Sequence, residues 1–347
     1  MTRKFRKMIS LIVAMAVLLS ATMVPSVAFG DSVSIRTSPE RTIADAVLAG
    51  FGDYQYLGST ELKNLNGESE AVCFRYAPDA YVIVNHNDLS VPEYSPSNPS
   101  PFEAEGATEY IYNGPLAHFY KDSSNLIRDL QTEEMVDVNE IDIIYEQPTI
   151  TSSQVVAKLR KTQYSTRASA QYMTNHTPVA WSADFFCGVQ GAAIVLRYLY
   201  DYHSTQVLPV GHTTNGAVQT YLVSQKYIPD DGTTANGLLN GSIVGNVSYK
   251  GLNRFFADRR SYIRGSTRVM SNGDWTTVQN SFTSDYPVLF GTTSYNSWTY
   301  RDHWLIAYGY YYQDLSGGSL IVNDGWGHNN IHVTTDLRYY HDIVLFS

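Results

Sequence analysis

The sequence predicts an α+β fold with an antiparallel sheet, divided into a small N-terminal part and a larger C-terminal part. Hydrophobic residues make up 44% of the 347 residues, which is enough for a sizeable core and argues against global disorder. In the second half, helical patterns come first and strand patterns come last, which is typical of α+β folds. The length allows one large domain or two of ordinary size.

The first 30 residues have the layout of a secretory signal peptide. A basic start precedes an almost wholly apolar run from Met8 to Leu19, and small residues around Ala28 offer a cleavage site. That run is shorter than the ~20 residues that span a bilayer. A lone membrane anchor is the alternative, and it is disfavoured because Pro25 and Gly30 follow at once. We therefore expect a secreted protein with no membrane contact in its mature form.

Charge and motif content exclude several function classes. The formal net charge of −9 argues against a nucleic-acid partner held by phosphate contacts. The chain contains no HExxH and no CxxC motif. His328 and His332 would form a metal pair only on a helix, but their context is a loop running into a strand. We therefore predict no metal and no cofactor.

Residues 31–150 are predicted to form the small α+β domain. "RTIADAVLAG" (41–50) is a short helix ended by glycine. "AVCFRYAPDAYVIVN" (71–85) is a hairpin, because two strand-like runs flank the turn sequence Ala-Pro-Asp-Ala. Two further segments are predicted: a loop over residues 91–106, too proline-rich for regular structure, and a strand with a turn into helix over residues 107–120.

The chain has two cysteines, Cys73 and Cys187. A disulfide framework in a secreted domain normally uses more. One bridge between the two stays open, but they lie in different predicted domains, so we expect two thiols with different fates. Cys73 lies on the first strand of the predicted hairpin, where a buried small hydrophobic residue is the better interpretation.

Residues 151–169 are predicted to be a linker and activation region, with an ordinary surface loop as the alternative. The segment is polar and rich in serine and threonine. Ser152 and Ser153 could cap a short helix through Lys158. We expect the stretch from Arg160 to Ala170 to be exposed and within reach of a protease.

Residues 170–347 are predicted to form the second domain. Its helix that follows Cys187 continues with apolar residues at helical spacing, which indicates a buried face. The expected helices are residues 191–202, 215–227 and 248–258, and the expected strands are residues 288–292, 303–312 and 319–323.

Cys187 is the candidate nucleophile. It stands directly before a helical run in "WSADFFCGVQGAAIVLRYL". A thiol attacks as its thiolate, which a helix N-terminus favours. Gly188 and Gly191 allow close backbone approach. The alternative is that Cys187 is one more apolar residue of a core helix.

A base and an orienting group are available on the predicted strands. His303 opens the run "HWLIAYGYYY", although alone it would more often be a structural histidine. "VNDGWG" supplies Asn323 and Asp324 at the end of the next strand, where antiparallel pairing would bring them beside His303. Trp326 could cover this pair from water. The alternative is a plain hairpin turn.

The order of these three groups carries a resemblance to a known family. Residues 170–347 resemble papain-like cysteine peptidases of the branch that contains bacteriocin-leader peptidases and their secreted relatives. The similar stretches are "CGVQGAAIVLRYLYDY", "DHWLIAYGYYY" and "VNDGWG". The resemblance implies a papain-like fold, with a catalytic helix packed on an antiparallel sheet. It also implies Asp324, rather than Asn323, as the orienter, and hydrolysis of a peptide or protein substrate through an acyl-enzyme.

The N-terminal part resembles the pro-region of streptopain-like bacterial peptidases through "AVCFRYAPDAYVIVNHND". This resemblance implies a zymogen, in which residues 31 to about 165 act as the enzyme's own inhibitor until they are removed.

One departure from the family pattern bears on catalysis. The family usually has a glutamine a few residues before the cysteine, but Trp181 stands six residues before Cys187. Losing one oxyanion donor typically costs ~10²–10³ in rate. Asn175, Ser182 or a backbone amide are the candidate replacements. Two alternatives therefore stay open: a catalytically degraded module that binds peptide or cell-wall ligands, and a Cys-His-Asp amidase or acyltransferase.

Overall fold

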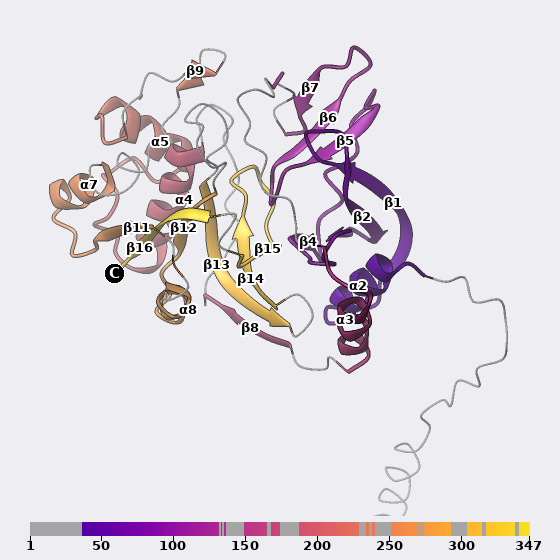
Figure 1. Cartoon of the computed structure of the whole chain (residues 1–347). Helices are drawn as coiled ribbons and strands as arrows, with labels where there is room; N and C mark the ends of the chain where they lie inside the picture. The colour runs from indigo at the N-terminus through magenta and orange to yellow at the C-terminus, as the bar shows by residue number, and fades with distance from the viewer. Residues whose placement is uncertain are drawn as a thin grey trace, which may run out of the picture. The chain divides into compact units, whose positions relative to one another are not determined.

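The computed structural model shows a mixed α+β protein with one large sheet and six helices in its described part (Figure 1). The chain divides into Met1–Thr37 and Ser38–Ser347, and the structure described below is that of the second unit. No helix among the described residues is long and apolar enough to cross a membrane. The described residues are 37–131, 133, 135–136, 149–164, 168–173, 187–228, 234–235, 238–239, 251–269, 271, 274–292, 304–313, 317–336 and 340–347.

Fourteen strands of the described chain form one sheet in the order β11-β16-β12-β13-β14-β15-β4-β3-β2-β1-β5-β6-β7, with β8 paired to β13. Strands β9 (Thr234–Ala235) and β10 (Leu238–Leu239) form a separate small pair. The strands of the large sheet are β1 (Gln55–Lys63), β2 (Ser69–Ala77), β3 (Ala80–Asn85), β4 (Glu93–Ser95), β5 (Glu109–Tyr112), β6 (His118–Lys121), β7 (Ile127–Asp129), β8 (Ala168–Tyr172), β11 (Gly265–Val269), β12 (Val288–Thr292), β13 (Trp304–Gln313), β14 (Gly317–Asn323), β15 (Ile331–Thr334) and β16 (Tyr340–Phe346).

The six helices account for most of the helical predictions. The expected helices over 41–50, 191–202 and 215–227 are confirmed, although each boundary shifts by a few residues. The expected helix over 248–258 is present as a shorter one, and part of that range lies outside the described residues. The helices are α2 (Pro39–Leu48), α3 (Ser152–Tyr164), α4 (Cys187–Tyr202), α5 (Asn215–Ser224), α7 (Asn253–Asp258) and α8 (Asp274–Thr283).

Helix α2 begins with a side-chain cap. The Ser38 hydroxyl accepts a hydrogen bond from the Arg41 backbone N–H at 3.2 Å, and Pro39 follows at the first helical position. Ile43 and Val47 are fully buried on the face of α2 that packs against β3. The helix therefore covers one side of the N-terminal strands.

The predicted hairpin over residues 71–85 is confirmed as β2 and β3, with Cys73 opposite Ile83. Cys73 is a free thiol with no solvent exposure, and burial raises its pKa to about 12. The interpretation of Cys73 as a buried small hydrophobic residue is therefore confirmed. A thiol in this state is a poor nucleophile at neutral pH.

The predicted loop over residues 91–106 is wrong at its start, because β4 lies within it. Pro92 and Pro96 flank the strand instead of interrupting it, so all three residues between them keep their backbone N–H groups. Strand β4 pairs with β3 on one side and with β15 on the other. Strand β4, in a segment predicted to be a loop, thus joins the two parts of the sheet.

Over residues 107–120, the predicted strand is confirmed as β5, but the predicted turn into helix is wrong. The chain forms the hairpin β5–β6, whose turn is closed by the Asn113 and Ala117 backbone groups. Gly114 (φ 105°) and Leu116 (φ 62°) adopt left-handed conformations in this turn, which end any helical path.

The predicted linker carries regular structure. Helix α3 continues past Lys158 to Tyr164, and its start is capped by Thr151 and Gln154 rather than by Ser152 or Ser153. Strand β8 then pairs with β13. The position of the domain boundary itself stays a prediction.

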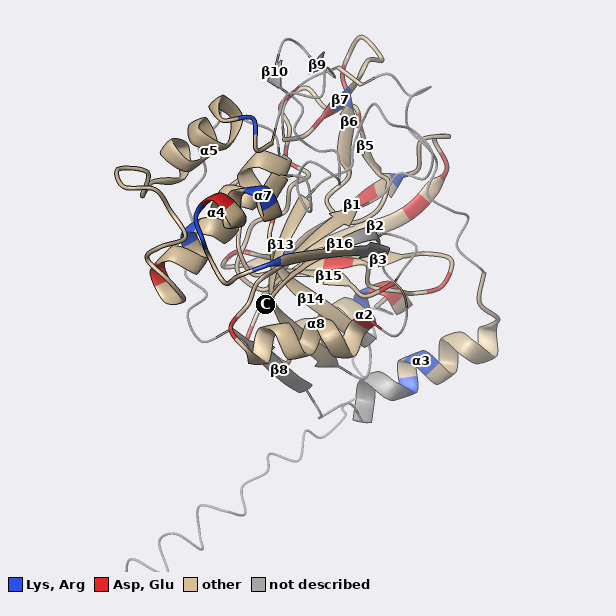
Figure 2. Cartoon of the chain, turned by 90° about the vertical axis from the view of Figure 1, so that its left-hand side faces the viewer, with Lys and Arg blue, Asp and Glu red and all other residues tan. Residues whose placement is uncertain are grey.

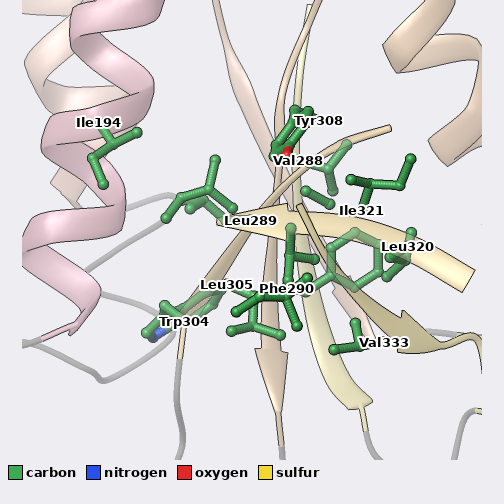
Figure 3. Close-up of a cluster of buried hydrophobic side chains, with 14 of the residues drawn as sticks. Ile194, Val288, Leu289, Phe290, Trp304, Leu305, Tyr308, Leu320, Ile321 and Val333 are labelled. Carbon is green, nitrogen blue, oxygen red and sulfur yellow. The ribbon is translucent and has the colours of Figure 1, made fainter. Parts of the chain in front are cut away.

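The antiparallel sheet predicted for the C-terminal part is confirmed, since every pairing among its described strands is antiparallel. Figure 3 shows Ile194 of α4 on the side of the helix that faces Leu289 of β12. Phe290 and Leu305 continue this fully buried layer. In the view of Figure 2, acidic and basic positions are interspersed over the described elements.

Candidate active site

Cys187 is the first residue of α4. Its side chain lies outside the described residues, but its backbone begins a helix of 16 residues, so the partial positive charge of a helix N-terminus lies at this position. The residues that follow it, Gly188 and Val189, are buried. The helix thus starts inside the protein rather than at its surface.

The first turn of α4 contacts two other segments of the predicted site. The Gln190 side-chain Nε2 donates to the Gly325 carbonyl at 3.1 Å, and Gln190 is 1% exposed. At Gly191, a Cβ atom would lie 3.7 Å from the Cβ of Trp304. The start of α4 therefore lies against the beginning of β13 and against the turn that follows β14.

These contacts locate the neighbours of His303 and Asp324. His303 lies outside the described residues, but it directly precedes Trp304, the first residue of β13. Three residues after His303, Ile306 pairs with Asn323 at the end of β14. Chain positions adjacent to Cys187, His303 and Asp324 therefore converge, while the roles of the three residues stay predictions.

Asp324 is 3% exposed and accepts hydrogen bonds from three directions. Its Oδ1 accepts the backbone N–H groups of Trp326 at 2.7 Å and His328 at 3.1 Å. Its Oδ2 lies 2.7 Å from Nδ1 of the His328 ring. This arrangement holds a carboxylate in a fixed orientation at the end of β14.

The sequence predicts no role for His328, because its loop context excludes a metal pair, yet its ring contacts Asp324. The hydrogen bond to Asp324 raises the pKa of His328 above its ordinary value, and partial burial opposes this shift. The signal that could have found this pair is the four-residue spacing across a turn that begins with Asp-Gly.

Four further residues were candidates for the oxyanion site or for supporting roles, and the structure describes two of them. The Asn323 side chain shapes the turn, because its Oδ1 accepts from the Gly325 backbone N–H at 2.7 Å and its Nδ2 donates to Asn329 Oδ1 at 2.8 Å. Trp326 is half-buried, and its proposed cover over the site stays a prediction. Asn175 and Ser182 lie outside the described residues, so the second oxyanion donor also stays a prediction.

The described residues contain no group of three or more His, Cys, Asp and Glu side chains that could hold a metal ion. His332, for which the sequence predicts no metal pair with His328, is fully buried in β15, and this burial lowers its pKa to about 3. It is therefore a neutral imidazole near pH 7.

No family model and no curated protein match the sequence. Among solved structures, a fragment of prointerpain A from Prevotella intermedia, determined as a cysteine-to-alanine mutant, is similar with a TM-score of 0.41. The sequence identity is 12%, and the alignment covers 84% of this chain and 98% of that chain.

Proposed function

We propose that the protein is a secreted cysteine endopeptidase made as a proenzyme, with Cys187 as nucleophile, His303 as general base and acid, and Asp324 as orienter. The observation that carries the proposal is the contact of the first turn of α4 with two distant segments. Gln190 binds the carbonyl that follows Asp324, and Gly191 packs on the residue that follows His303.

The chemistry follows from these positions. The Cys187 thiolate attacks the carbonyl carbon of the scissile peptide bond, and the backbone N–H at the start of α4 stabilises the resulting oxyanion. His303 gives its proton to the leaving amine, which leaves a thioester. A water molecule, deprotonated by His303, then hydrolyses the thioester and releases the acid and the free thiol. Asp324 accepts a hydrogen bond from His303 and fixes its tautomer.

The remaining parts of the proposal concern processing. Residues 1–30 direct secretion, and residues 31 to about 165 act as the inhibitor of the catalytic domain. The substrate is a peptide or protein. These statements rest on the sequence patterns described above.

The test uses purified residues 31–347 under reducing conditions, with an epoxide-type irreversible thiol-protease inhibitor as probe. We expect mass spectrometry to find the probe on Cys187 and to show self-trimming near residues 155–170. Cys187→Ala and His303→Ala should abolish both, because each removes an obligatory group. Cys73→Ala is the matched control and should leave both unchanged, since that thiol is buried.

Two results would contradict the proposal. Equal trimming of Cys187→Ala, with no labelling of the wild-type thiol, would support the degraded module. Labelling of Cys187 together with transfer of the acyl group to an added amine, instead of to water, would identify an acyltransferase.

A further inference from the structure

A backbone ladder connects the N-terminal half (residues 38–164) to the C-terminal half (residues 168–347). Tyr94 and Glu93 of β4 pair with His332 and Val333 of β15. One residue further, the Thr334 N–H donates to the Pro92 carbonyl at 2.8 Å. The two halves therefore share one continuous sheet (Figure 1).

Buried aromatic side chains pack across this junction. The Tyr94 ring stacks on the His332 ring with centroids 4.5 Å apart, and the two residues are 1% and 0% exposed. Phe51 of the N-terminal half packs edge-on against His332 at 5.3 Å and lies 4.9 Å from the Tyr311 ring of β13. Aromatic rings buried to this extent are characteristic of the centres of stable interfaces.

A second set of contacts lies on the turn that carries Asp324. Asn98 Nδ2 donates to the Asn329 carbonyl at 2.6 Å, and Ser95 Oγ donates to the Asn330 carbonyl at 3.1 Å. In the other direction, Asn330 Nδ2 donates to Ser97 Oγ at 3.1 Å. We call residues 92–98 together with residues 329–334 the clasp.

We propose that the N-terminal half stays bound to the C-terminal half through the clasp after the chain is cut between α3 and β8. The C-terminal half then presents the edge of β15 and the Asn329–Asn330 segment as a docking surface for the cut N-terminal half. Cleavage and release are thus separate events, and the turn bearing Asp324 remains held in the cut form. The proposal rests on the proposed function only for the expectation that the chain is cut there.

The test separates association from catalysis by using the inactive Cys187→Ala chain. A recognition sequence for a site-specific protease replaces residues 165–167, between α3 and β8, and the chain is cut to completion. We expect light scattering coupled to size exclusion to show one species with the mass of the uncut chain at micromolar concentration. Tyr94→Ala should raise the dissociation constant of the halves ~100-fold, and Asn98→Ala ~10-fold.

Tyr112→Ala is the matched control. Tyr112 is 3% exposed, as buried as Tyr94, but it belongs to a core cluster formed by the N-terminal half alone. This variant should leave the dissociation constant unchanged. Separation of the wild-type halves at micromolar concentration, or equal weakening by Tyr112→Ala and Tyr94→Ala, would overturn the proposal.

A second measurement covers the case in which Tyr94→Ala fails to fold. In the cut protein with wild-type Tyr94, hydrogen exchange of the Thr334 amide should stay slow, because its bond to Pro92 persists. Fast exchange of that amide after cutting would overturn the proposal. Failure of Cys187 to react with a thiol probe would contradict the proposed function and would not affect this test.

Discussion

The Asp324 carboxylate combines burial with a full set of hydrogen-bond donors. Two backbone N–H groups hold its Oδ1, and the His328 ring lies against its Oδ2. Hydrogen bonds from these donors offset the cost of burying the carboxyl group. These contacts hold the carboxyl group in one orientation, with its Oδ2 beside an imidazole at the end of β14.

The pKa of His328 depends on its contact with the Asp324 carboxyl group. We expect His328 to titrate above its ordinary pKa of 6.5, because the Asp324 carboxylate stabilises the imidazolium. In Asp324→Asn the pKa should fall back toward 6.5 or below, since partial burial then acts alone. The measurement is an NMR titration of the histidine ring protons. Identical values in the two proteins would show that the pair does not form in solution.

The buried amide of Gln190 ties the helix start to the Asp324 turn. Gln190→Met keeps the shape of the side chain but removes its hydrogen bond to the Gly325 carbonyl. Leaving a buried acceptor unpaired typically costs ~1–3 kcal/mol. We expect Cys187 to react ~10-fold more slowly with the epoxide probe while the chain remains folded. The reason is that a small displacement of a reacting group lowers its rate of reaction. Unchanged labelling kinetics would show that this contact does not position the site.

Sequence reasoning located the residues of the turn but not their partners. "VNDGWG" marked the end of a strand, and the structure has β14 ending at Asn323. Which donors Asp324 receives depends on how the turn folds back over four residues. His328 was missed because its ring reaches Asp324 only when the turn folds back, and the four-residue spacing alone does not specify that fold.

At the scale of elements, the approach of α4 to the sheet depends on a residue without a side chain. A Cβ atom at Gly191 would lie only 3.0 Å from Cδ2 of Leu289 on β12, and the sheet residues around it are fully buried. Glycine at this position allows the backbone of the helix to rest directly on β12 and β13. The start of α4 can then reach the turn after β14.

Gly191→Val tests this close packing. The added side chain must displace Leu289 or move α4 away from the sheet, and overpacking of a core typically costs ~1–3 kcal/mol. We expect a lower urea midpoint and slower labelling of Cys187, because the helix start moves with the helix. Asp201→Val, at an exposed position of the same helix, is the comparison for the β-branched side chain. Equal stability of Gly191→Val and wild type would contradict the close approach.

Elements with strong periodic patterns were predicted well, and those defined by long-range pairing were not. Strands β12, β13 and β14 are continuous apolar runs whose type follows from the sequence alone. Strand β4 has three residues between prolines, and it is a strand only because β3 and β15 supply partners on both sides. Local composition contains no information about such partners, so the connection between the two halves was invisible in the sequence.

At the scale of the whole molecule, we expect His332, which lies at the junction of the two halves, to make the stability of the protein depend on pH. Among the described residues, its ring contacts Phe51, Tyr94, Tyr311, Ser319 and Asn330, all of them uncharged. Burial without a counter-charge lowers its pKa to about 3. Because the unfolded chain binds this proton near pH 6.5, the unfolded state gains protons first as the pH falls.

The direction in which pH changes the stability follows from the lowered pKa of His332. The contribution of neutral His332 is fully present above pH 6.5 and is lost progressively between pH 6.5 and about pH 3. Between pH 7 and pH 4 the loss is about 3 kcal/mol, since each pKa unit corresponds to ~1.4 kcal/mol.

His332→Phe keeps a ring beside Tyr94 but cannot titrate. Urea unfolding of the two proteins at pH 7 and pH 4 should therefore show a steeper loss of stability for the wild type. His86 provides an internal contrast, because its pKa is raised beside Glu40 and Glu61 and its contribution is instead lost as the pH rises. Its effect is common to both proteins and cancels in their difference. Parallel losses in wild type and His332→Phe would show that His332 does not make the stability of the protein depend on pH.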